Sequence, residues 1–476
     1  MYENLSLYID GKFTSGDSGV TSDVLNPSKD SVLGKLPHAK KPELDAALAA
    51  AEKGFQVWKK VSAFERSKIL RKAADLLRER TDAIAQVLTL EQGKVLVEAK
   101  MEIQGAADII EWFAEEGRRA YGRIIPARAD GVRNMMIMEP IGPVAGFAPW
   151  NFPVTQASRK IAAALAAGCS IIIKCPEETP GSPIGLVRAF HDAGVPPGVI
   201  NLVYGVPAEL SEYLIPSPTI RKISFTGSVP VGKHLNALAG AHMKRATMEL
   251  GGHSPVLVFD DAETEQVATL MAAMKYRNAG QVCISPTRFF VHDKVYDAFV
   301  SKFTDIAKRT TVGDGLEPNS KMGPLANPRR VNAMESFMQD AQEKGAKVAT
   351  GGKRIGNQGN FFEPTVLTDI PENARILNEE PFGPVALMLR FNDTDEMLQR
   401  ANKLPYGLAS YAFTRNGKTA AKVADALDSG MVTINHHGLA LPELPFGGVK
   451  DSGFGYEGGA EGLAVYMTGK FVSYLG

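Results

Sequence analysis

The sequence predicts an α/β protein that is built on parallel sheets, of the Rossmann-like type in its first half. Short β-rich runs alternate with helical stretches between residues 144 and 260, and again from about residue 271 to 432. This alternation is typical of strand–helix–strand units, whose strands lie parallel in one sheet. The length of 476 residues exceeds what one hydrophobic core normally organises, so two or three domains are expected.

The segment before the first alternating region is predicted to be helical and to end in an arm. Apolar residues recur at helical spacing from Lys41 to Glu116. From Tyr121 to Pro140 the residues alternate and become basic, and Arg133–Met138 is a candidate strand of an arm or hairpin. The apolar run Lys470–Leu475 would be an exposed edge if unpaired, so we expect it to pair with the arm or with another subunit.

The alternating regions place ligands at one edge of a sheet. The first region holds these predicted strands and helices: Val144–Phe147, Ser170–Lys174, Val199–Tyr204, Lys222–Thr226 and Val256–Asp260; Thr155–Ala167, Ile184–Ala193, Pro207–Leu214 and Val231–Ala239. In the second region the strand candidates are Arg288–Val291, Lys347–Thr350 and Val385–Phe391. Parallel sheets of this kind bind ligands at the carboxyl ends of their strands.

Composition narrows the class of protein and its compartment. The 53 basic and 53 acidic residues cancel, which gives no reason to expect nucleic acid or an anionic membrane as a partner. The longest apolar stretch, Ile161–Ile173, is too short to span a bilayer, and residues 1–13 contain no signal-peptide core. Only three cysteines are present, as in proteins of a reducing compartment. We therefore expect a cytoplasmic protein.

Cys283 is the candidate nucleophile. It lies in a small, polar and flexible context, Asn278-Ala279-Gly280-Gln281-Val282-Cys283-Ile284-Ser285, whereas Cys169 and Cys175 are assigned structural roles. A thiolate is the strongest nucleophile that a side chain offers near neutral pH. A cysteine taken alone is more often a small buried hydrophobe, so its neighbours must decide.

Two further side chains suit a reaction at a carbonyl carbon. Asn151, in Trp150-Asn151-Phe152-Pro153, follows a predicted strand end, where its amide could stabilise an oxyanion together with the backbone N–H of Cys283. The alternative is that Asn151 caps the following helix. Glu249 lies between apolar residues and Gly251-Gly252, where burial would raise its pKa toward that of a general base. A solvated or salt-bridged glutamate is the alternative there.

Three motifs suit a dinucleotide. Lys174 and Glu177 follow the strand Ser170–Lys174, where they can hold ribose hydroxyls, and the carboxylate would repel a 2′-phosphate, which favours NAD over NADP. A solvated lysine–glutamate pair is the alternative. Phe225-Thr226-Gly227-Ser228 opens a helix whose free N–H groups can bind a pyrophosphate. The loop Glu379-Glu380-Pro381-Phe382-Gly383-Pro384 offers one acid and one aromatic ring, or is simply a proline–glycine turn.

A fourth glycine-rich motif fails its context test. Gly453-Phe454-Gly455-Tyr456-Glu457-Gly458 matches the G-x-G-x-x-G fingerprint of dinucleotide-binding proteins. It follows the loop Pro445–Ser452 rather than a strand, and no βαβ unit with its acidic residue can follow it. We interpret it as a tight loop near a site or an interface.

Taken together, the motifs resemble the aldehyde dehydrogenase superfamily. The resemblance runs along nearly the whole chain and rests on five ordered motifs: Trp150-Asn151-Phe152-Pro153, Phe225-Thr226-Gly227-Ser228, Glu249-Leu250-Gly251-Gly252, Gly280-Gln281-Val282-Cys283 and Glu380-Pro381-Phe382-Gly383-Pro384. It implies that Cys283 attacks an aldehyde, that Asn151 holds the oxyanion, and that Glu249 activates the water that hydrolyses a thioester. Lys174 is also placed among the catalytic residues.

The resemblance further implies the domains and the cofactor site. It divides the chain into an NAD-binding domain (residues 1–120 and 139–248), a catalytic domain (249–440) and an oligomerisation arm (121–138 and 460–476), and it implies a homodimer or homotetramer. NAD is the expected cofactor, with NADP possible, and no metal is expected. The implied cofactor-binding residues are Pro149, Trp150, Asn151, Lys174, Glu177, Gly205, Phe225, Gly227, Ser228, Leu250, Gly251, Glu380 and Phe382.

Two arginines suggest an aldehyde that carries a carboxylate. Arg159 lies eight residues after Asn151 and Arg277 six before Cys283, where they could clamp a distal carboxylate or instead form surface salt bridges. The chain is similar to succinate-semialdehyde dehydrogenases, but Ser285 replaces the second thiol that they often have. Residues 283–288 and 359–362 look closer to 2-oxoglutarate-semialdehyde (2,5-dioxopentanoate) dehydrogenases, which makes that substrate the preferred expectation. Succinate semialdehyde is the alternative, and a CoA-acylating relative is disfavoured because Glu249 is present.

Overall fold

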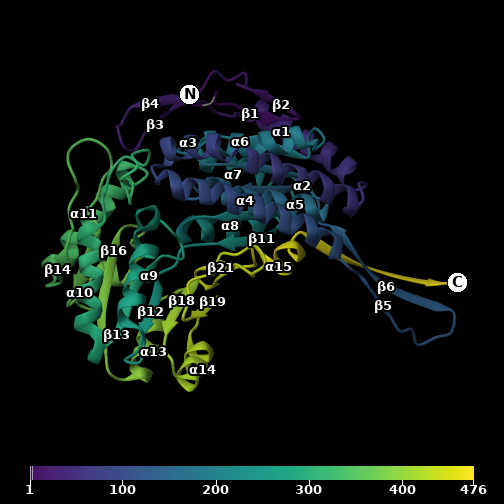
Figure 1. Ribbon diagram of the computed structural model, residues 1–476. Helices are drawn as coiled ribbons and strands as arrows, with labels where there is room; N and C mark the ends of the chain where they lie inside the picture. The colour runs from purple at the N-terminus through teal and green to yellow at the C-terminus, as the bar shows by residue number, and fades with distance from the viewer. Residues whose placement is uncertain (1, 3) are drawn as a thin grey trace.

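Two mainly parallel sheets and a projecting arm organise the computed structural model, which describes residues 2 and 4–476 (Figure 1). The first sheet has the strand order β2-β1-β9-β8-β7-β10-β11-β21. Its strands are β1 (Leu7–Ile9), β2 (Lys12–Thr14), β7 (Val144–Phe147), β8 (Ile171–Lys174), β9 (Ile200–Val203), β10 (Lys222–Thr226), β11 (Arg245–Glu249) and β21 (Gly453–Phe454). The strands from β9 to β11 run parallel, and the outer strands β1, β2 and β21 pair antiparallel.

The second sheet has the order β14-β15-β16-β13-β12-β18-β19. Its strands are β12 (Ser254–Val258), β13 (Pro286–His292), β14 (Lys347–Thr350), β15 (Thr365–Thr368), β16 (Val385–Phe391), β18 (Ala409–Phe413) and β19 (Met431–Ile434). All neighbours are parallel except β14 and β15. One prediction was wrong here: the strand expected at Val256–Asp260 pairs with β13 and β18 and so belongs to this sheet, not to the first.

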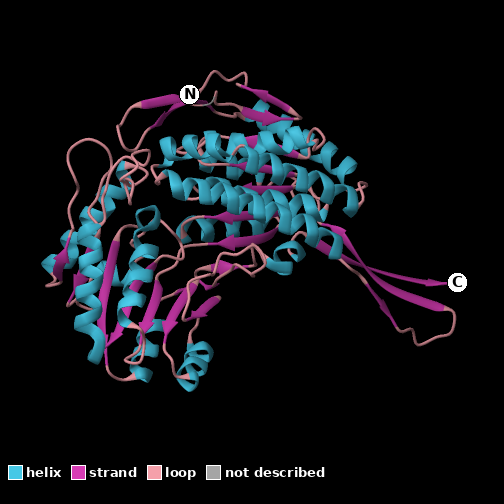
Figure 2. Cartoon of the chain, in the orientation of Figure 1, coloured by secondary structure: helices cyan, strands magenta, loops and turns pink. Residues whose placement is uncertain are grey.

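Helices cover both sheets, as Figure 2 shows in cyan. With the first sheet lie α1 (Lys41–Trp58), α2 (Ala63–Glu79), α3 (Thr81–Gln92), α4 (Leu96–Glu116), η1 (Gly117–Arg119), α5 (Pro153–Ala167), α6 (Gly181–Ala193), α7 (Pro207–Leu214), α8 (Val229–Ala241) and α15 (Gly459–Ala464). With the second lie α9 (Thr264–Tyr276), η2 (Arg277–Gly280), α10 (Asp293–Arg309), α11 (Pro328–Glu343), α12 (Arg375–Asn378), α13 (Thr394–Asn402) and α14 (Gly417–Ala426). Within the described residues, no helix has the length and apolar character needed to cross a membrane.

Each sheet has its own hydrophobic core. Nearly every residue of α5 is buried, because this helix packs between the first sheet and α4. Two separate clusters of buried apolar side chains result, one around each sheet. Two small antiparallel pairs complete the chain: β3 (Thr21–Leu25) with β4 (Val32–Pro37), and β17 (Tyr406–Gly407) with β20 (Val449–Lys450).

A three-stranded antiparallel arm projects from the body (Figure 1). It consists of β5 (Arg123–Ile125), β6 (Val132–Pro140) and β22 (Met467–Leu475), and β22 pairs with β6 along its whole length. The expected pairing of the run Lys470–Leu475 with the arm is therefore confirmed. Ile124, Phe471 and Leu475 are exposed on the arm. The predicted homodimer or homotetramer stays a prediction, as does the cytoplasmic location.

The two sheets meet where β11 passes into β12. Glu249 is the last residue of β11, and Ser254 is the first of β12, so the carboxyl edge of the first sheet lies close to the amino edge of the second. The strand β21 pairs with β11 at this junction, with Gly453 opposite Glu249. A Cβ on Gly453 would lie 1.9 Å from the carbonyl oxygen of Met248, so this close pairing requires glycine. The former fingerprint motif thus borders the junction, as its interpretation as a tight loop implied.

Candidate active site

Cys283 lies just before β13, at the amino edge of the second sheet. The preceding residues Asn278, Ala279 and Gly280 all have left-handed backbone angles, with φ of 48°, 51° and 71°. A non-glycine residue in this conformation costs about 1–2 kcal/mol, a kind of strain that concentrates at functional sites. A Cβ on Gly280 would lie 2.1 Å from the carbonyl oxygen of Gly383, so the Cys283 loop packs directly on the Glu380 loop.

The Cys283 thiol is the accessible one of the three. Cys169 and Cys175 are buried, and burial raises the pKa of both thiols, which agrees with structural roles. Burial, followed by the carboxylates of Glu380 and Glu249, raises the pKa of Cys283 to about 12. The backbone N–H groups of Ile284 and Cys283 act in the opposite direction, since they favour the thiolate. The thiol therefore needs a nearby proton acceptor before it can react.

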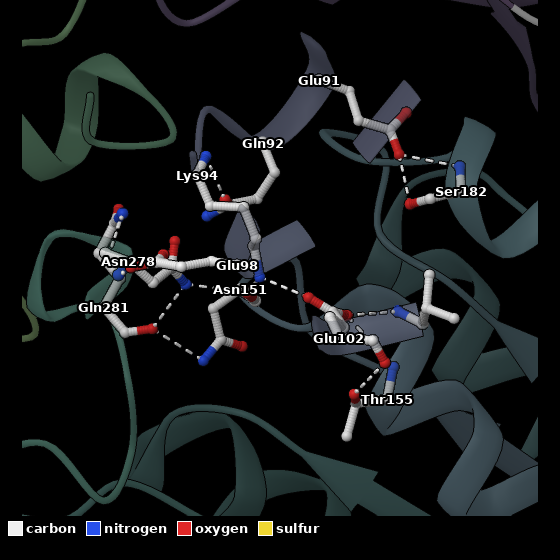
Figure 3. A network of polar contacts seen from close by, with 11 residues as sticks. Glu91, Gln92, Lys94, Glu98, Glu102, Asn151, Thr155, Ser182, Asn278 and Gln281 are labelled. Carbon is white, nitrogen blue, oxygen red and sulfur yellow. Dashed lines mark hydrogen bonds and ion pairs between the residues drawn. The ribbon is translucent and has the colours of Figure 1, made fainter. Parts of the chain in front are cut away.

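Asn151 lies beside the Cys283 loop and does not cap α5. It follows β7, and its Nδ2 donates to the carbonyl oxygen of Gln281 at 3.0 Å, two residues before Cys283 (Figure 3). The N-cap of α5 is Phe152, and the helix has no side-chain cap. Since an amide nitrogen carries two hydrogens, the second N–H of Asn151 could donate to a further acceptor, such as an oxyanion formed at Cys283.

Glu249 has the setting of a buried general base. Neither of its carboxylate oxygens has a hydrogen-bond partner among the described residues, and the residue is 1% exposed. Burial, followed by the charge of Glu457, raises its pKa well above the ordinary value, whereas Lys160 and Arg159 act against that rise. A carboxylate that has a raised pKa and no hydrogen-bond donor occupying its oxygens is suited to taking a proton from a thiol or from water.

Glu457 is a buried acid that sequence reasoning did not single out as a site residue. Its Oε1 forms an ion pair with Lys160 Nζ at 2.5 Å and accepts from Ser224 Oγ at 2.8 Å. Lys160 also donates to Thr226 Oγ1 at 2.6 Å, so α5, β10 and the segment after β21 are joined behind Glu249. Glu457 lies inside the rejected glycine motif, but only the fold brings it to β10.

The carboxyl edge of the first sheet presents groups that fit a dinucleotide. Lys174 Nζ pairs with Glu177 Oε2 at 2.7 Å, and the other oxygen of Glu177 accepts from the Gly205 N–H at 3.2 Å. The pair is largely buried rather than solvated, at 8% and 21% side-chain exposure. The ring of Phe225 packs against the backbone of Gly227. Ser228 is the N-cap of α8 and its side chain forms no capping hydrogen bond, so N–H groups of the first turn remain for a phosphate.

The Glu380 loop faces this edge from the second sheet. Glu380 accepts from the Gly252 N–H at 3.0 Å, and a Cβ on Gly251 would lie 2.2 Å from its carboxylate. Phe382 lies edge-on to Trp150, with 5.6 Å between ring centroids. Pro149 precedes Trp150 after the end of β7. The backbone N–H of Leu250 donates to the carbonyl oxygen of Ser452 at 3.0 Å. These residues, with Lys174 and Glu177, would hold the nicotinamide and ribose groups of NAD(P).

Arg159 and Arg277 have different surroundings. Arg159 is buried on α5, where it donates to the carbonyl oxygens of Glu457 and, at 3.0 Å, of Ala440. Arg277 is half-buried over the ring of Phe152, 5.1 Å from its centroid. Across residues 2 and 4–476, its guanidinium forms neither a hydrogen bond nor an ion pair. Arg277 is thus the cation with free donors, whereas Arg159 holds the segment 440–457 in place. Neither is a surface arginine in a salt bridge.

The assembled groups can carry out acyl transfer through a covalent intermediate. A thiol, an amide donor and a buried carboxylate come from the Cys283 loop, the end of β7 and the end of β11, and a dinucleotide cradle borders all three. The set combines a nucleophile, an oxyanion donor and a base that can take the proton of the nucleophile. The three residues were predicted from the sequence, whereas their hydrogen-bonded neighbours were found only in the fold.

Comparison with known proteins finds one family along almost the whole chain. The sequence model of the Aldehyde dehydrogenase family matches residues 13–472. The chain is 44% identical to a 4-(hydroxymethyl)benzenesulfonate dehydrogenase of Comamonas testosteroni, over 100% of this chain and 99% of that protein. It is 41% identical to an NADP(+) succinate-semialdehyde dehydrogenase of Escherichia coli, over 98% and 96%. The NAD+ complex of an aldehyde dehydrogenase from Bacillus cereus superposes with a TM-score of 0.97, at 35% identity over 99% of this chain and 97% of that one.

Proposed function

The chain belongs to the aldehyde dehydrogenase family, and from that premise we propose that it oxidises a short aldehyde with a distal anionic group to the corresponding acid, in an NAD(P)-dependent reaction. The observation that carries the proposal is that the charge of a buried carboxylate, Glu249, acts on a half-buried thiol, Cys283, while neither oxygen of Glu249 has a hydrogen-bond partner among the described residues.

The first half of the reaction forms a thioester. The thiol of Cys283 gives its proton to Glu249, whose raised pKa makes it the better acceptor, and the sulfur bonds to the aldehyde carbon. The aldehyde oxygen gains negative charge and accepts from the free N–H of Asn151 and from the Cys283 N–H. A bound nicotinamide cofactor would accept the hydride that leaves this carbon. The oxygen then reforms a carbonyl, which leaves an acyl group on Cys283.

The second half releases the acid. Glu249, once its proton has been lost to solvent, takes a proton from a water molecule as the water oxygen attacks the thioester carbon. The carbon–sulfur bond breaks, the acid leaves, and the sulfur of Cys283 regains a proton. Transfer of the acyl group to CoA would need no base for a water molecule, whereas Glu249 would be required only for Cys283 in the first half. A carboxylate that can also accept a proton from water therefore supports hydrolysis over transfer to a thiol.

The free guanidinium of Arg277 supports an anionic substrate. It lies over Phe152, the residue after Asn151, and six positions before Cys283, where it could receive the distal anion of an aldehyde bound to the thiol. The names of the relatives above include a sulfonate and a succinate semialdehyde, and both groups are anions that a guanidinium binds. Among the carboxylated aldehydes we prefer 2-oxoglutarate semialdehyde, with succinate semialdehyde as the alternative, on the motifs at residues 283–288 and 359–362.

Replacing Arg277 by alanine is expected to raise KM for anionic aldehydes about 10- to 100-fold, because a hydrogen bond to a charged group contributes about 1.5–3 kcal/mol. The KM for hexanal should change little. The panel would hold 2-oxoglutarate semialdehyde, succinate semialdehyde, 4-formylbenzenesulfonate and hexanal, with NADH formation as the readout. Arg159→Ala is the matched comparison: it should impair charged and uncharged aldehydes alike, because Arg159 holds the segment 440–457. Equal effects of Arg277→Ala on all four aldehydes would contradict the distal-anion proposal.

Glu177 supports a preference for NAD over NADP. Its carboxylate is fixed by Lys174 and by the Gly205 N–H, and a carboxylate held beside the adenine ribose would repel a 2′-phosphate. We expect Glu177→Ser to raise kcat/KM for NADP relative to NAD by about 10-fold or more, because it removes the repulsion and frees Lys174. Glu178→Ser is the control, since Glu178 pairs with Arg329 instead. A cofactor ratio that is the same in both variants and the wild type would refute this role.

A further inference from the structure

Lys94 is a buried lysine that makes three interactions next to the oxyanion donor. It follows α3 and has no side-chain exposure. Its Nζ pairs with Glu102 Oε2 at 2.5 Å and donates to the main-chain carbonyl oxygen of Asn151 at 2.7 Å (Figure 3). The same ammonium lies 3.9 Å from the centroid of the Phe152 ring. An ion pair removed from water in this way is seldom favoured on stability grounds over apolar residues of similar volume.

Glu102 connects Lys94 to the start of α5. Its second oxygen, Oε1, accepts from the backbone N–H groups of Val154 at 3.0 Å and Thr155 at 3.2 Å. These are first-turn groups of a helix without a side-chain cap of its own, and a carboxylate there is also favoured by the helix dipole. Lys94 therefore holds the main chain of Asn151, and Glu102 holds the first turn of the helix that follows it.

A second set of contacts joins the same segment to the Cys283 loop. Asn278 Nδ2 donates to the Asn151 carbonyl oxygen at 3.0 Å, so that oxygen accepts from two donors. Glu98, one turn before Glu102 on α4, accepts from the backbone N–H of Asn278 at 2.9 Å. As Figure 3 shows, the side chains of α4 and of Lys94 thus reach both the oxyanion donor and the loop that carries the nucleophile.

We propose that Lys94, supported by Glu102, is a positioning residue that fixes the main chain of Asn151 so that the free N–H of its side chain points at the oxygen above Cys283. This inference rests on the function proposed above. Its physical basis is that the direction of the side-chain N–H of Asn151 depends on the position of the backbone that carries it. A misplacement of about 1 Å at a reacting group lowers rates by about 100-fold.

The test is a double-mutant cycle between Lys94 and Asn151. Lys94→Met keeps the volume of the side chain and removes its donors. It should lower the rate of first-turnover NADH formation about 10- to 100-fold, with the KM for aldehyde and for cofactor nearly unchanged, because one oxyanion donor is worth about 10²- to 10³-fold. In an Asn151→Ala background, Lys94→Met should cause little further loss, since the group that it positions is already gone.

Two further variants separate positioning from stability. Lys222→Met is the control: Lys222 is equally buried, donates to Thr247 Oγ1 at 2.5 Å and lies over Tyr466, away from Asn151. It should lower the melting temperature without lowering the first-turnover rate of the folded protein. If Lys94→Met does not fold, Glu102→Gln takes its place in the cycle, because it breaks the same ion pair.

Each outcome decides the matter. Non-additive losses at Lys94 and Asn151 support the inference. Multiplying losses, a wild-type rate in Lys94→Met, or the same loss in Lys222→Met would overturn it, even when Asn151→Ala alone is strongly impaired. A wild-type rate in Asn151→Ala would instead overturn the oxyanion role of Asn151, and with it the proposed function of the donor that Lys94 holds.

Discussion

Replacing Cys283 by alanine is expected to abolish NADH formation, with a loss of at least about 10⁴-fold, because no thioester can form without the sulfur. The aldehyde would still bind beside Asn151 and Arg277, but hydride would have to leave a carbon that carries no covalent bond to the protein. Cofactor reduction, followed by absorbance, measures the loss. Mass spectrometry of wild type quenched during turnover should show an acyl group on Cys283 that the variant lacks.

Cys175→Ala is the matched control for this experiment. Cys175 follows β8 beside the dinucleotide cradle, but it is buried, and burial raises the pKa of its thiol. Its replacement should leave the turnover rate within a fewfold of wild type. If Cys283→Ala retains comparable activity to Cys175→Ala, covalent catalysis through Cys283 is wrong.

Replacing Glu249 by glutamine should slow both halves of the reaction, because Glu249 takes a proton from Cys283 in the first half and from water in the second. Turnover should fall about 10²- to 10⁴-fold, the range for a general base. The rate of first-turnover NADH formation measures the first half, and it should fall as well. Added hydroxylamine, which attacks a thioester without a base, should therefore restore turnover only in part. A variant with wild-type turnover would remove Glu249 from the mechanism.

The raised pKa of Glu249 also fixes the direction of the pH dependence. The base must be ionised, so hydrolysis should rise as the pH increases through the raised pKa and fall as the pH drops below it. The limb should lie well above the ordinary glutamate range and should disappear in Glu249→Gln. The sign for stability is opposite: because the folded state holds this proton more tightly than the unfolded chain, its contribution to stability is lost as the pH rises through the same window.

Much of the fold could be predicted from the sequence, because helix and strand character depend on local pattern, and the three proposed reacting residues lie in motifs that the sequence singles out. The strands at residues 144–147, 222–226 and 385–391 and the helix at 207–214 match the structure to the residue, since apolar runs bounded by turns define them. The strand predicted at Val256–Asp260, which is β12 in the structure, was placed in the wrong sheet because strand character is local, whereas the choice of partner strand depends on the whole chain.

The supporting residues could not be predicted for the same reason. Lys94, Glu102 and Glu457 lie in ordinary helical or glycine-rich segments. Lys94 and Glu102 are eight positions apart, but their contacts with the Asn151 segment and the contact of Glu457 with Lys160 span between 52 and 297 positions of the chain. No spacing rule connects a lysine after α3 to the carbonyl of Asn151. The feature that marks these residues is the burial of their charged groups, and burial can be seen only in the folded structure. Arg159 is an example: its position in the sequence suggested a contact with the substrate, but in the fold it donates to the carbonyl oxygens of Glu457 and Ala440, which are far away in the chain.

The pairing of β21 with β11 sets an order of events during biosynthesis. Gly453 lies opposite Glu249, and Glu457 forms an ion pair with Lys160. Gly453 and Glu457 are both translated about 200 residues after Glu249. At about 5–20 residues per second this is a delay of roughly 10–40 s, and Cys283 is translated early in it. The edge of β11 has no β21 to pair with in that interval. The growing chain therefore contains Cys283 and Glu249 well before the strand that completes the junction between the two sheets.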